Sequence, residues 1–471
     1  MMTLTTEQLD KLTREDLLEL LKRLLPLVEE LERLRQRVEE LEAENERLKN
    51  RSANSRNSSQ PPSRDQKVNQ PPKKKPKKHG PPFGHQKFSR PLVDNPDRVI
   101  QLSVAECGYC LADLTGVQPE DFERRQITEL PTAKPIVIET RRHLTTCPHC
   151  LTLNRPILPE GLQAERCFGP NLEATVVFYK QTQHLSYERI VETMRDLHGV
   201  NLSEGAVAQI LERAGQKAAP AAETIKEQII KDQVIKSDET SARVEGRNYW
   251  QWVFIGASGV YHTIVPTRSA SEIATVMGKS RVEAWVCDCY GAQLKAPARV
   301  FQLCLAHQLR DLQRALDANP REKWASAMQK LFRSAIHLRN RFNDKRSALT
   351  LLGFQRLATR IENQLDQLLE KAVMSETSRK LLNRFTTHRD KLLNFLRYPE
   401  IPPTNNESEQ ALRGSVVHRK VTNCFRSKWG AKAYADLQTV IATAKHKGKA
   451  VFPALVDLMG APVLPFLCRS A

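Results

Sequence analysis

Three acidic residues lie where a carboxylate could take part in chemistry. Asp238 closes the run Val-Ile-Lys-Ser-Asp, Asp288 closes Val-Glu-Ala-Trp-Val-Cys-Asp, and Glu409 follows Thr-Asn-Asn at 404–406 on a helix-like stretch. The two aspartates end short apolar runs typical of strands, so we expect each to project from a strand end. Taken singly, acidic residues are mostly solvated surface groups. Together, three converging carboxylates could hold two magnesium or manganese ions, which is the chemistry of cutting and joining phosphodiester bonds.

Two Cys-x-x-Cys pairs indicate a second metal. Thiolates three residues apart on a tight turn can both reach one tetrahedral zinc ion, although 36 residues separate the two pairs, more than in common zinc modules. We predict one structural zinc ion in a module over 91–168, with the ligands Cys107, Cys110, Cys147 and Cys150. His143 and His149 are possible substitute ligands, but a role outside the metal site is favoured for both.

The elements that must position the aspartates lie in residues 233–305. A helix at 271–277 and a hairpin turn at 256–259 interrupt runs of β-branched and aromatic residues that predict five strands, 234–235, 249–255, 260–265, 284–287 and 300–304. The order is βββαβ, followed by a further strand and a helix that begins near Ala306. We interpret 233–305 as the first part of an α/β catalytic core.

A helical, charged block at 306–400 separates that segment from its second part, 401–471, which carries Glu409 and C-terminal helices. Basic residues past Glu409 could touch a DNA backbone, or could form a solvated basic face: Arg413, Arg419 and Lys420. His307 opens the first helix of the block, and a packing role is favoured over a place in the site.

Residues 1–50 predict a leucine-zipper-like coiled coil. Apolar residues recur in steps of three and four from Leu17 to Leu48, with Asn45 at an a position. Three attractive g-to-e′ pairs favour a parallel homodimer over a single helix packed on the protein: Glu30 with Arg35, Arg37 with Glu42, and Glu44 with Lys49. Pro26 is expected to kink or start the main helix.

Residues 51–90 are rich in Ser, Asn, Gln and Pro and show no apolar periodicity, which predicts a disordered linker. The linker has eleven Lys and Arg against Asp65 alone, a net charge of +10. We expect either a solubilising tether or an arm that contacts phosphates without reading sequence, through Lys73, Lys74, Lys75, Lys77 and Lys78.

Residues 169–232 have a helical period. One helix begins near Leu185 and ends at Gly199, and Ser203 caps the next. Helix, short turn and capped helix outline a helix-turn-helix, although plain helical hairpins share that outline.

Composition narrows the class of protein. The chain of 471 residues has a net charge of +18 and a pI of about 9.5, which suits a polyanionic partner, nucleic acid or an anionic membrane surface. No run of about 18 apolar residues occurs, and the N-terminus lacks a signal-peptide pattern. We expect a cytoplasmic protein with no membrane partner, in which paired cysteines bind metal.

These motifs resemble the insertion-sequence-66 family of bacterial transposases, DDE-type enzymes with a ribonuclease-H-like catalytic domain. The resemblance rests on the leucine-rich helix, the linker, the cysteine pairs, Ser-Asp-Glu-Thr at 237–240, Cys-Leu-Ala-His at 304–307 and Asn-Asn-Glu-Ser-Glu-Gln-Ala-Leu-Arg at 405–413. The family pattern there is like Asp-Asn-Asn-x-x-Glu-Arg-Ala-Leu-Arg, so Thr404 and Gln410 depart from it.

The resemblance implies a multi-domain α+β protein in which Asp238, Asp288 and Glu409 hold the catalytic metals. It further implies a nucleoid-associated transposase that acts on double-stranded transposon ends and target DNA, alone or with companion transposition proteins. The alternative is a non-catalytic DNA-binding regulator with zinc and helix-turn-helix modules.

Overall fold

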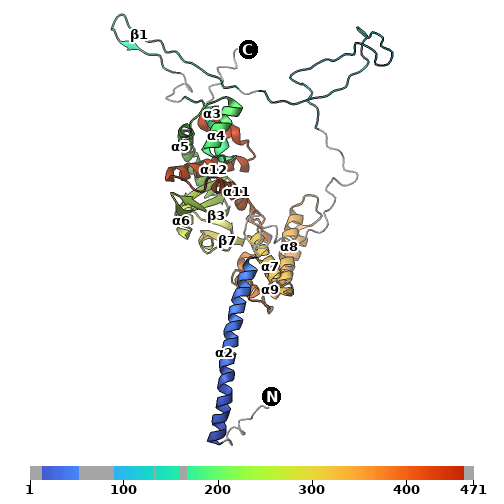
Figure 1. Cartoon of the computed structure of the whole chain (residues 1–471), viewed down its shortest axis with the longest axis vertical. Helices are drawn as coiled ribbons and strands as arrows, with labels where there is room; N and C mark the ends of the chain where they lie inside the picture. Colours follow the sequence, from blue (N-terminus) through green and yellow to red (C-terminus); the bar gives the residue numbers. More distant parts are fainter. Residues whose placement is uncertain (1–12, 52–89, 132–133, 159–166, 461–471) are drawn as a thin grey trace. The chain divides into compact units, whose positions relative to one another are not determined.

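The computed structural model describes residues 13–51, 90–131, 134–158 and 167–460 (Figure 1). It is a mixed α+β structure, as predicted. Contacts divide the chain into two units, which are treated separately: residues 1–70, 142–190 and 203–471 form the first, and residues 71–141 and 191–202 form the second.

A five-stranded sheet forms the centre of the first unit, in the spatial order β5-β4-β3-β6-β7. Its strands are β3 (Val234–Val244), β4 (Arg247–Ile255), β5 (Val260–Val265), β6 (Val282–Cys287) and β7 (Ala298–Leu303). β3, β4 and β5 are antiparallel neighbours, whereas β3, β6 and β7 run parallel. With α6 (Ala270–Met277) between β5 and β6, the predicted βββαβ order is confirmed.

The first strand is longer than predicted. β3 continues past Asp238 and pairs with β4 up to Val244 and Arg247, through a turn in which Glu245 and Gly246 both have positive φ angles, of 52° and 76°. The hairpin extends because alternating side chains keep the paired ribbon half-buried beyond the aspartate. Asp238 therefore lies within the stretch of β3 that pairs with β4. The prediction that Asp238 ends its strand is wrong for this pairing.

Alternation along the strands gives the sheet two apolar faces. One face, with Ile235, Trp252 and Trp285, packs with α6 and the end of α5 (Glu204–Ile229). On the other face, Val253 and Ile255 pack against Leu412 of α11 (Asn406–Thr422).

Further helices pack against the sheet and against one another. α12 (Lys428–His446) packs on β5 and on α5, and α13 (Val451–Met459) packs on α3 (Pro170–Gln181). A Cβ at Gly215 of α5 would lie 2.3 Å from Cβ of Ala433 in α12, so these two helices meet with their backbones in contact. Glycine is required at this position because any side chain would force α5 and α12 apart.

The predicted helical block is confirmed. It comprises α7 (Leu305–Ala318), α8 (Lys323–Asn343), α9 (Leu351–Leu369) and α10 (Glu376–Thr387), followed by short 3₁₀ turns η4 (Arg389–Lys391) and η5 (Asn394–Leu396). A third 3₁₀ turn, η3 (Gln293–Lys295), precedes β7. The core of the block, including Trp324, Phe332 and Phe385, continues onto Val286 and Leu303 of the sheet.

α4 (Tyr187–His198) ends before Gly199, whose φ is +65°, and the Ser203 hydroxyl caps α5 by accepting a hydrogen bond from the Ala206 N–H at 3.1 Å. The end of the one helix and the start of the next are therefore where the glycine and serine predicted them.

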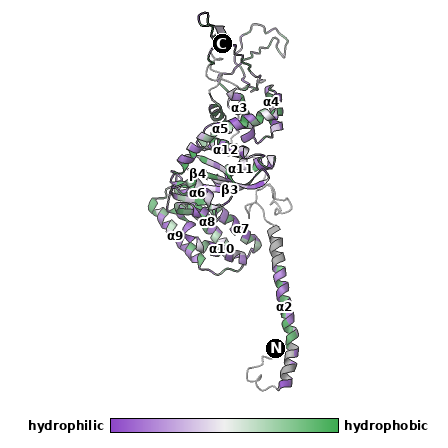
Figure 2. Cartoon of the chain, turned by 90° about the vertical axis from the view of Figure 1, so that its left-hand side faces the viewer, coloured by the Kyte–Doolittle hydropathy of each residue, from purple (hydrophilic) through white to green (hydrophobic). Residues whose placement is uncertain are grey.

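α2 (Arg14–Arg51) is one continuous helix that includes Pro26, so the proline does not start the helix. Hydrophobic and hydrophilic residues alternate along it (Figure 2). The seam residues from Leu24 to Leu41 are exposed in the single chain, at 45% for Leu24 and 59% for Leu34. For Leu17, Leu20, Asn45 and Leu48 the structure describes the helical backbone but not the side chains.

Candidate active site

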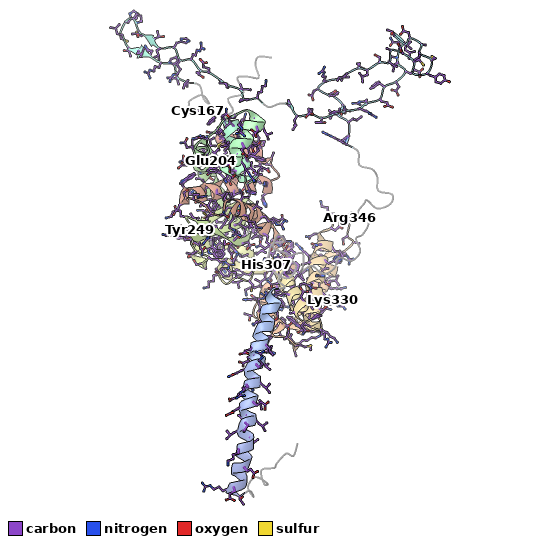
Figure 3. All side chains as sticks on the ribbon, viewed as in Figure 1. Cys167, Glu204, Tyr249, His307, Lys330 and Arg346 are labelled. Atoms are coloured by element: carbon purple, nitrogen blue, oxygen red, sulfur yellow. The ribbon has the colours of Figure 1, made fainter. Side chains whose placement is uncertain are left out.

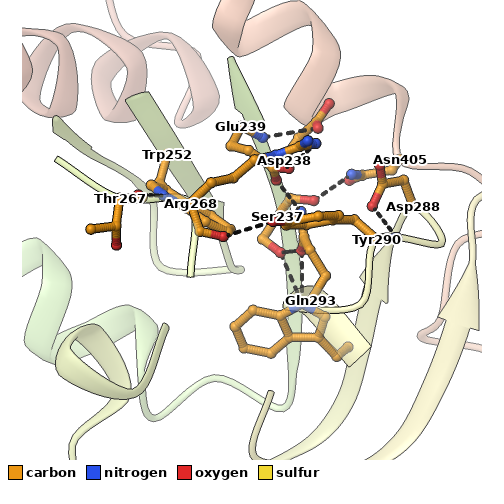
Figure 4. A network of polar contacts seen from close by, with 11 residues as sticks. Ser237, Asp238, Glu239, Trp252, Thr267, Arg268, Asp288, Tyr290, Gln293 and Asn405 are labelled. Carbon is orange, nitrogen blue, oxygen red and sulfur yellow. Dashed lines mark hydrogen bonds and ion pairs between the residues drawn. The ribbon is translucent and has the colours of Figure 1, made fainter. Parts of the chain in front are cut away.

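Two neighbouring parallel strands position the aspartates. Lys236 of β3 pairs with Val286 of β6, and Asp238 and Asp288 each follow two residues later. Both aspartates therefore lie at the same level and on the same face of the sheet, the face on which α11 packs. Asp288 directly follows the last residue of β6, as predicted, and its Oδ1 accepts a hydrogen bond from the Tyr290 N–H at 2.9 Å (Figure 4).

Asp238 has a strongly raised pKa. Burial raises its pKa to about 8, and the negative charges of Glu239, Asp288 and Glu409 contribute further. A hydrogen bond from the Glu239 N–H to Asp238 Oδ1, 2.9 Å long, acts in the opposite direction. Excess negative charge beside a partly buried carboxyl group is an arrangement that a bound cation would relieve.

Glu409 lies on the first turns of α11, where an arginine holds its carboxylate. Arg310 of α7 donates from Nη2 to Glu409 Oε1 at 2.5 Å, and His307 Nε2 lies 3.5 Å from the same oxygen. Burial and the Arg310 charge lower the pKa of His307, and its buried Nδ1 has no hydrogen-bond partner among the residues that the structure describes. The sequence favoured a packing role for His307, which is labelled in Figure 3. The structure instead places its ring against Glu409.

The three carboxyl groups are thus not yet gathered on one point. Within the described ranges, no group of three or more His, Cys, Asp and Glu side chains is close enough to hold a metal ion. The donors themselves suit magnesium or manganese, because carboxylate oxygens are hard ligands. Asp238 and Asp288 are adjacent, while Glu409 is engaged by Arg310.

Asn405 anchors α11 to the sheet, a role that sequence reasoning did not assign. Its Nδ2 donates to the Ser237 carbonyl at 2.6 Å, and its backbone N–H donates to the thiol of Cys304 at 3.1 Å. Ser408 in turn donates to Asn405 Oδ1 at 2.7 Å. Because Asn405 is fully buried, these contacts determine where the helix that carries Glu409 begins.

A fourth carboxylate, Glu239, lies on the opposite face of the sheet. Arg268 donates to its Oε1 at 2.6 Å, and Gln293 donates to its Oε2 (Figure 4). Arg268 also stacks on Tyr290 and Trp250, at 3.8 and 4.7 Å from their ring centroids. Burial, and then the Asp288 charge, raise the pKa of Glu239. These contacts hold β3 in place next to Asp238. They join residues far apart in the sequence, so no local pattern predicted them.

The predicted DNA-contacting cations differ in their surroundings. Arg413 and Lys420 are exposed on α11, whereas Arg419 donates to the backbone carbonyl and the hydroxyl of Ser241 in β3. Arg419 therefore joins α11 to the sheet. The five predicted contact residues of the linker lie outside the described residues: Lys73, Lys74, Lys75, Lys77 and Lys78.

The two cysteine pairs adopt the same local turn, each described within its own unit. The Cys107 N–H donates to the Ala112 carbonyl at 2.9 Å, and the Cys147 N–H donates to the Thr152 carbonyl at 2.9 Å. Leu111 and Leu151, one residue past each pair, have φ angles of +61° and +58°. Strands β1 (Thr145–Thr146) and β2 (Leu153–Asn154) flank the second turn.

Hydrogen bonds to sulfur favour thiolates in these turns. Backbone N–H groups of Cys110 and Tyr109 lower the pKa of the Cys107 thiol, and Thr152 lowers that of Cys150. Each turn therefore has the local form expected for a metal-binding pair. Whether the two pairs share one zinc ion stays a prediction.

The central sheet of this mixed α+β fold thus places Asp238 and Asp288 next to each other, in β3 and directly after β6. A family model described as Transposase IS66 family matches residues 165–433, more than half of the chain, and the chain belongs to that family. Residues 7–91 match a family of unknown function, DUF6444. The uncharacterized protein y4hP of Sinorhizobium fredii is 24% identical over 387 residues, 74% of this chain and 69% of that protein. Among the described helices, none is both long and apolar enough to cross a bilayer.

Proposed function

We propose that the chain is a transposase that cuts transposon-end DNA and joins it to target DNA by two-metal phosphodiester transfer. In this proposal the sheet with α11 is a ribonuclease-H-like catalytic core. The observation that carries the proposal is the Asp238–Asp288 pair, in β3 and directly after the neighbouring parallel strand β6. The Asp238 pKa is raised to about 8 by burial first, and then by the charges of Glu239, Asp288 and Glu409. Family membership supports the same reaction class.

Asp238, Asp288 and Glu409 would supply the oxygen ligands of two magnesium or manganese ions. When bound, the ions activate water or a 3′-hydroxyl and stabilise the leaving oxygen. The aspartates need little rearrangement, because they project from a braced sheet. Carboxylates that are to bind metal ions must be held in a fixed geometry before the metal arrives.

Glu409 has a switching role in this proposal. Its carboxylate, which Arg310 holds in this structure, would be a metal ligand when metal is bound, and Arg310 would then be available to contact a DNA phosphate. His307 stays neutral in this burial and keeps its contact with Glu409 without competing as a cation. Catalytic contacts that are incomplete in a chain without DNA would then be completed when DNA and metal bind.

The test is a strand-cleavage assay on duplex DNA carrying the transposon ends, with magnesium. Asp238→Asn, Asp288→Asn and Glu409→Gln should each reduce cleavage by more than about 100-fold, since loss even of groups that only support metal ligands costs 10–100-fold. Asp457→Asn is the matched control, because Asp457 is exposed on α13. Cleavage that survives the Asp238→Asn substitution would refute the assignment.

The alternative, a DNA-binding regulator without catalysis, draws on the helical segment α4–α5. Gly199 ends the first helix and Ser203 caps the second, as in a helix-turn-helix. The same assay separates the two functions. A wild-type chain that binds end DNA but never cleaves it, with either magnesium or manganese, supports the regulator.

A further inference from the structure

The helical block has an open groove between α8 and α9, which pack against each other. The groove has a volume of about 420 Å³. Its apolar floor includes Leu338 and Ile361, and its rim has four basic side chains, Arg333, His337, Arg341 and Arg360. The groove lies outside the carboxylate site described above, and the proposed chemistry makes no use of it.

The charge of α8 is one-sided. The helix has five Lys and Arg in its 21 residues and no Asp or Glu. Arg333, His337 and Arg341 follow each other at intervals of four, so they share one face of the helix. On α9, Arg356 and Arg360 repeat that interval and both are exposed. Arg356 and Arg360 are like charges at this spacing, which disfavours an isolated helix, and an anionic partner would offset that repulsion.

The acidic residues of the block do not supply that partner. Glu362 of α9 accepts hydrogen bonds from Arg397 at 2.9 and 2.8 Å, and Asp366 accepts from Arg389 at 2.6 and 3.0 Å. In the part of the chain that the structure describes, no carboxylate pairs with a groove arginine. The groove arginines, Arg333, Arg341 and Arg360, are therefore exposed and uncompensated.

The length of the row of basic side chains on α8 indicates which kind of anion fits it. Exposed Lys330, labelled in Figure 3, extends the row on α8. From Lys330 to Arg341 the helix rises about 16 Å at 1.5 Å per residue. Phosphates recur every ~3.4 Å of helix axis along one DNA strand, so several fit that length, whereas a single small anion reaches one or two cations.

We propose that the α8–α9 groove binds the phosphodiester backbone of duplex DNA, as a contact separate from the carboxylate site. Arginine suits this role because its planar fork donates two hydrogen bonds to one phosphate. Such contacts position DNA and read no sequence. The inference rests on the proposed function only in taking DNA as the substrate.

The experiment uses the full chain with Asp238→Asn, without divalent metal, so that binding is measured without cleavage. Arg333→Gln, Arg341→Gln and Arg360→Gln are combined in one groove variant. The matched control combines three exposed cations of the block outside the groove, Arg321→Gln, Lys371→Gln and Arg379→Gln. Fluorescence anisotropy with a random-sequence duplex is recorded at several salt concentrations.

The slope of log affinity against log salt should flatten by about 2 to 3 in the groove variant, because each lost phosphate contact removes about 0.9. The control should change it by less than about 1. Ser334→Glu, which places a carboxylate at the exposed groove rim, should weaken binding about 10-fold and provides a second variant if the triple substitution fails to fold.

Equal flattening in the groove and control variants would overturn the proposal, since it would show only the effect of net charge. Unchanged DNA affinity with a changed mass by light scattering would show that the groove binds protein instead. Neither outcome depends on cleavage, so failure of the groove and failure of the catalytic assignment are distinguishable.

Discussion

Asp238 and Asp288 hold equivalent positions on two adjacent parallel strands, each two residues beyond the paired Lys236 and Val286. The register therefore sets two carboxyl groups side by side on one face of the sheet. Burial, followed by the negative charges of Glu239 and Asp288, raises the Asp238 pKa to about 8. A cation bound between two carboxyl groups held in this way would favour their charged form.

Arg310 and metal should compete for Glu409. Arg310→Gln removes the guanidinium that holds Glu409 Oε1 at 2.5 Å, so we expect manganese affinity to rise by about 3- to 10-fold. Glu409→Gln should lower it. Calorimetric titration measures both, with Arg321→Gln as an exposed control. Unchanged affinity in the Arg310 variant would exclude competition between the arginine and the metal.

Zinc should be present at one ion per chain. We expect Cys107→Ser combined with Cys147→Ser to abolish it, because each substitution removes a thiolate from one pair. Cys167→Ser is the control, since that exposed thiol belongs to neither pair. Atomic emission analysis of purified protein gives the zinc content. Full zinc in the double variant would contradict the predicted site.

The exposed seam of α2 should form a parallel dimer. Leu34→Glu introduces a charge at a d position and should shift the mass by light scattering toward the single-chain 53.6 kDa. Gln36→Glu makes the same charge change two residues away, on the outer face, and should leave the mass unchanged. A monomeric wild type, or equal behaviour of both variants, would rule out the coiled coil.

His418 should make stability depend on pH. Burial first, then the Lys180 and His184 charges, lower its pKa to about 3, and its ring lies 4.4 Å from that of Tyr434. Only the unfolded chain binds a proton there below about pH 6.5, so the free energy of unfolding falls as pH drops toward 3.

Between pH 6.5 and pH 5, proton binding by His418 in the unfolded chain should lower the free energy of unfolding by about 1.5 kcal/mol. One group can change this free energy by at most about 1.36 kcal/mol per pH unit. His418→Phe should lose that dependence in urea denaturation. His446→Phe, at an exposed position, should retain it. A pH dependence that is the same in the wild type and the His418 variant would show that the ring takes up protons in the folded chain.

The basic linker should strengthen DNA binding without setting sequence preference. Replacing its lysine cluster by Gln should flatten the salt slope and weaken end and random DNA alike; the cluster is Lys73, Lys74, Lys75, Lys77 and Lys78. Competition binding with both DNAs measures this. A loss confined to the transposon end would mean that the linker reads sequence.

Local patterns in the sequence predicted much of the catalytic core. Alternation and β-branched residues marked β4 and β5, and the Gly256 N–H does donate to the Gly259 carbonyl at 3.0 Å in the hairpin between them. The apolar run before Asp288 marked β6, and Ser203 marked the start of α5. These features depend on neighbours a few residues apart, which a single sequence displays directly.

Contacts between distant residues were decided by the tertiary structure alone. Arg310 reaches Glu409 across 99 residues, and Asn405 reaches the Ser237 carbonyl across 168. Neither pair has a local spacing that would reveal it. The α8–α9 groove likewise depends on how two helices pack, which leaves its arginines without acidic partners.

The sequence by itself determined the chemistry available to this protein: the carboxylates, the cysteine pairs, the basic excess and the elements that carry them. The tertiary structure decided which of these groups meet. Strand register set Asp238 beside Asp288, and the tertiary fold brought Arg310 of α7 into contact with Glu409 of α11. The physical reason is that residue type and local periodicity are encoded within a few positions, whereas register and helix packing come from burying surface between distant segments.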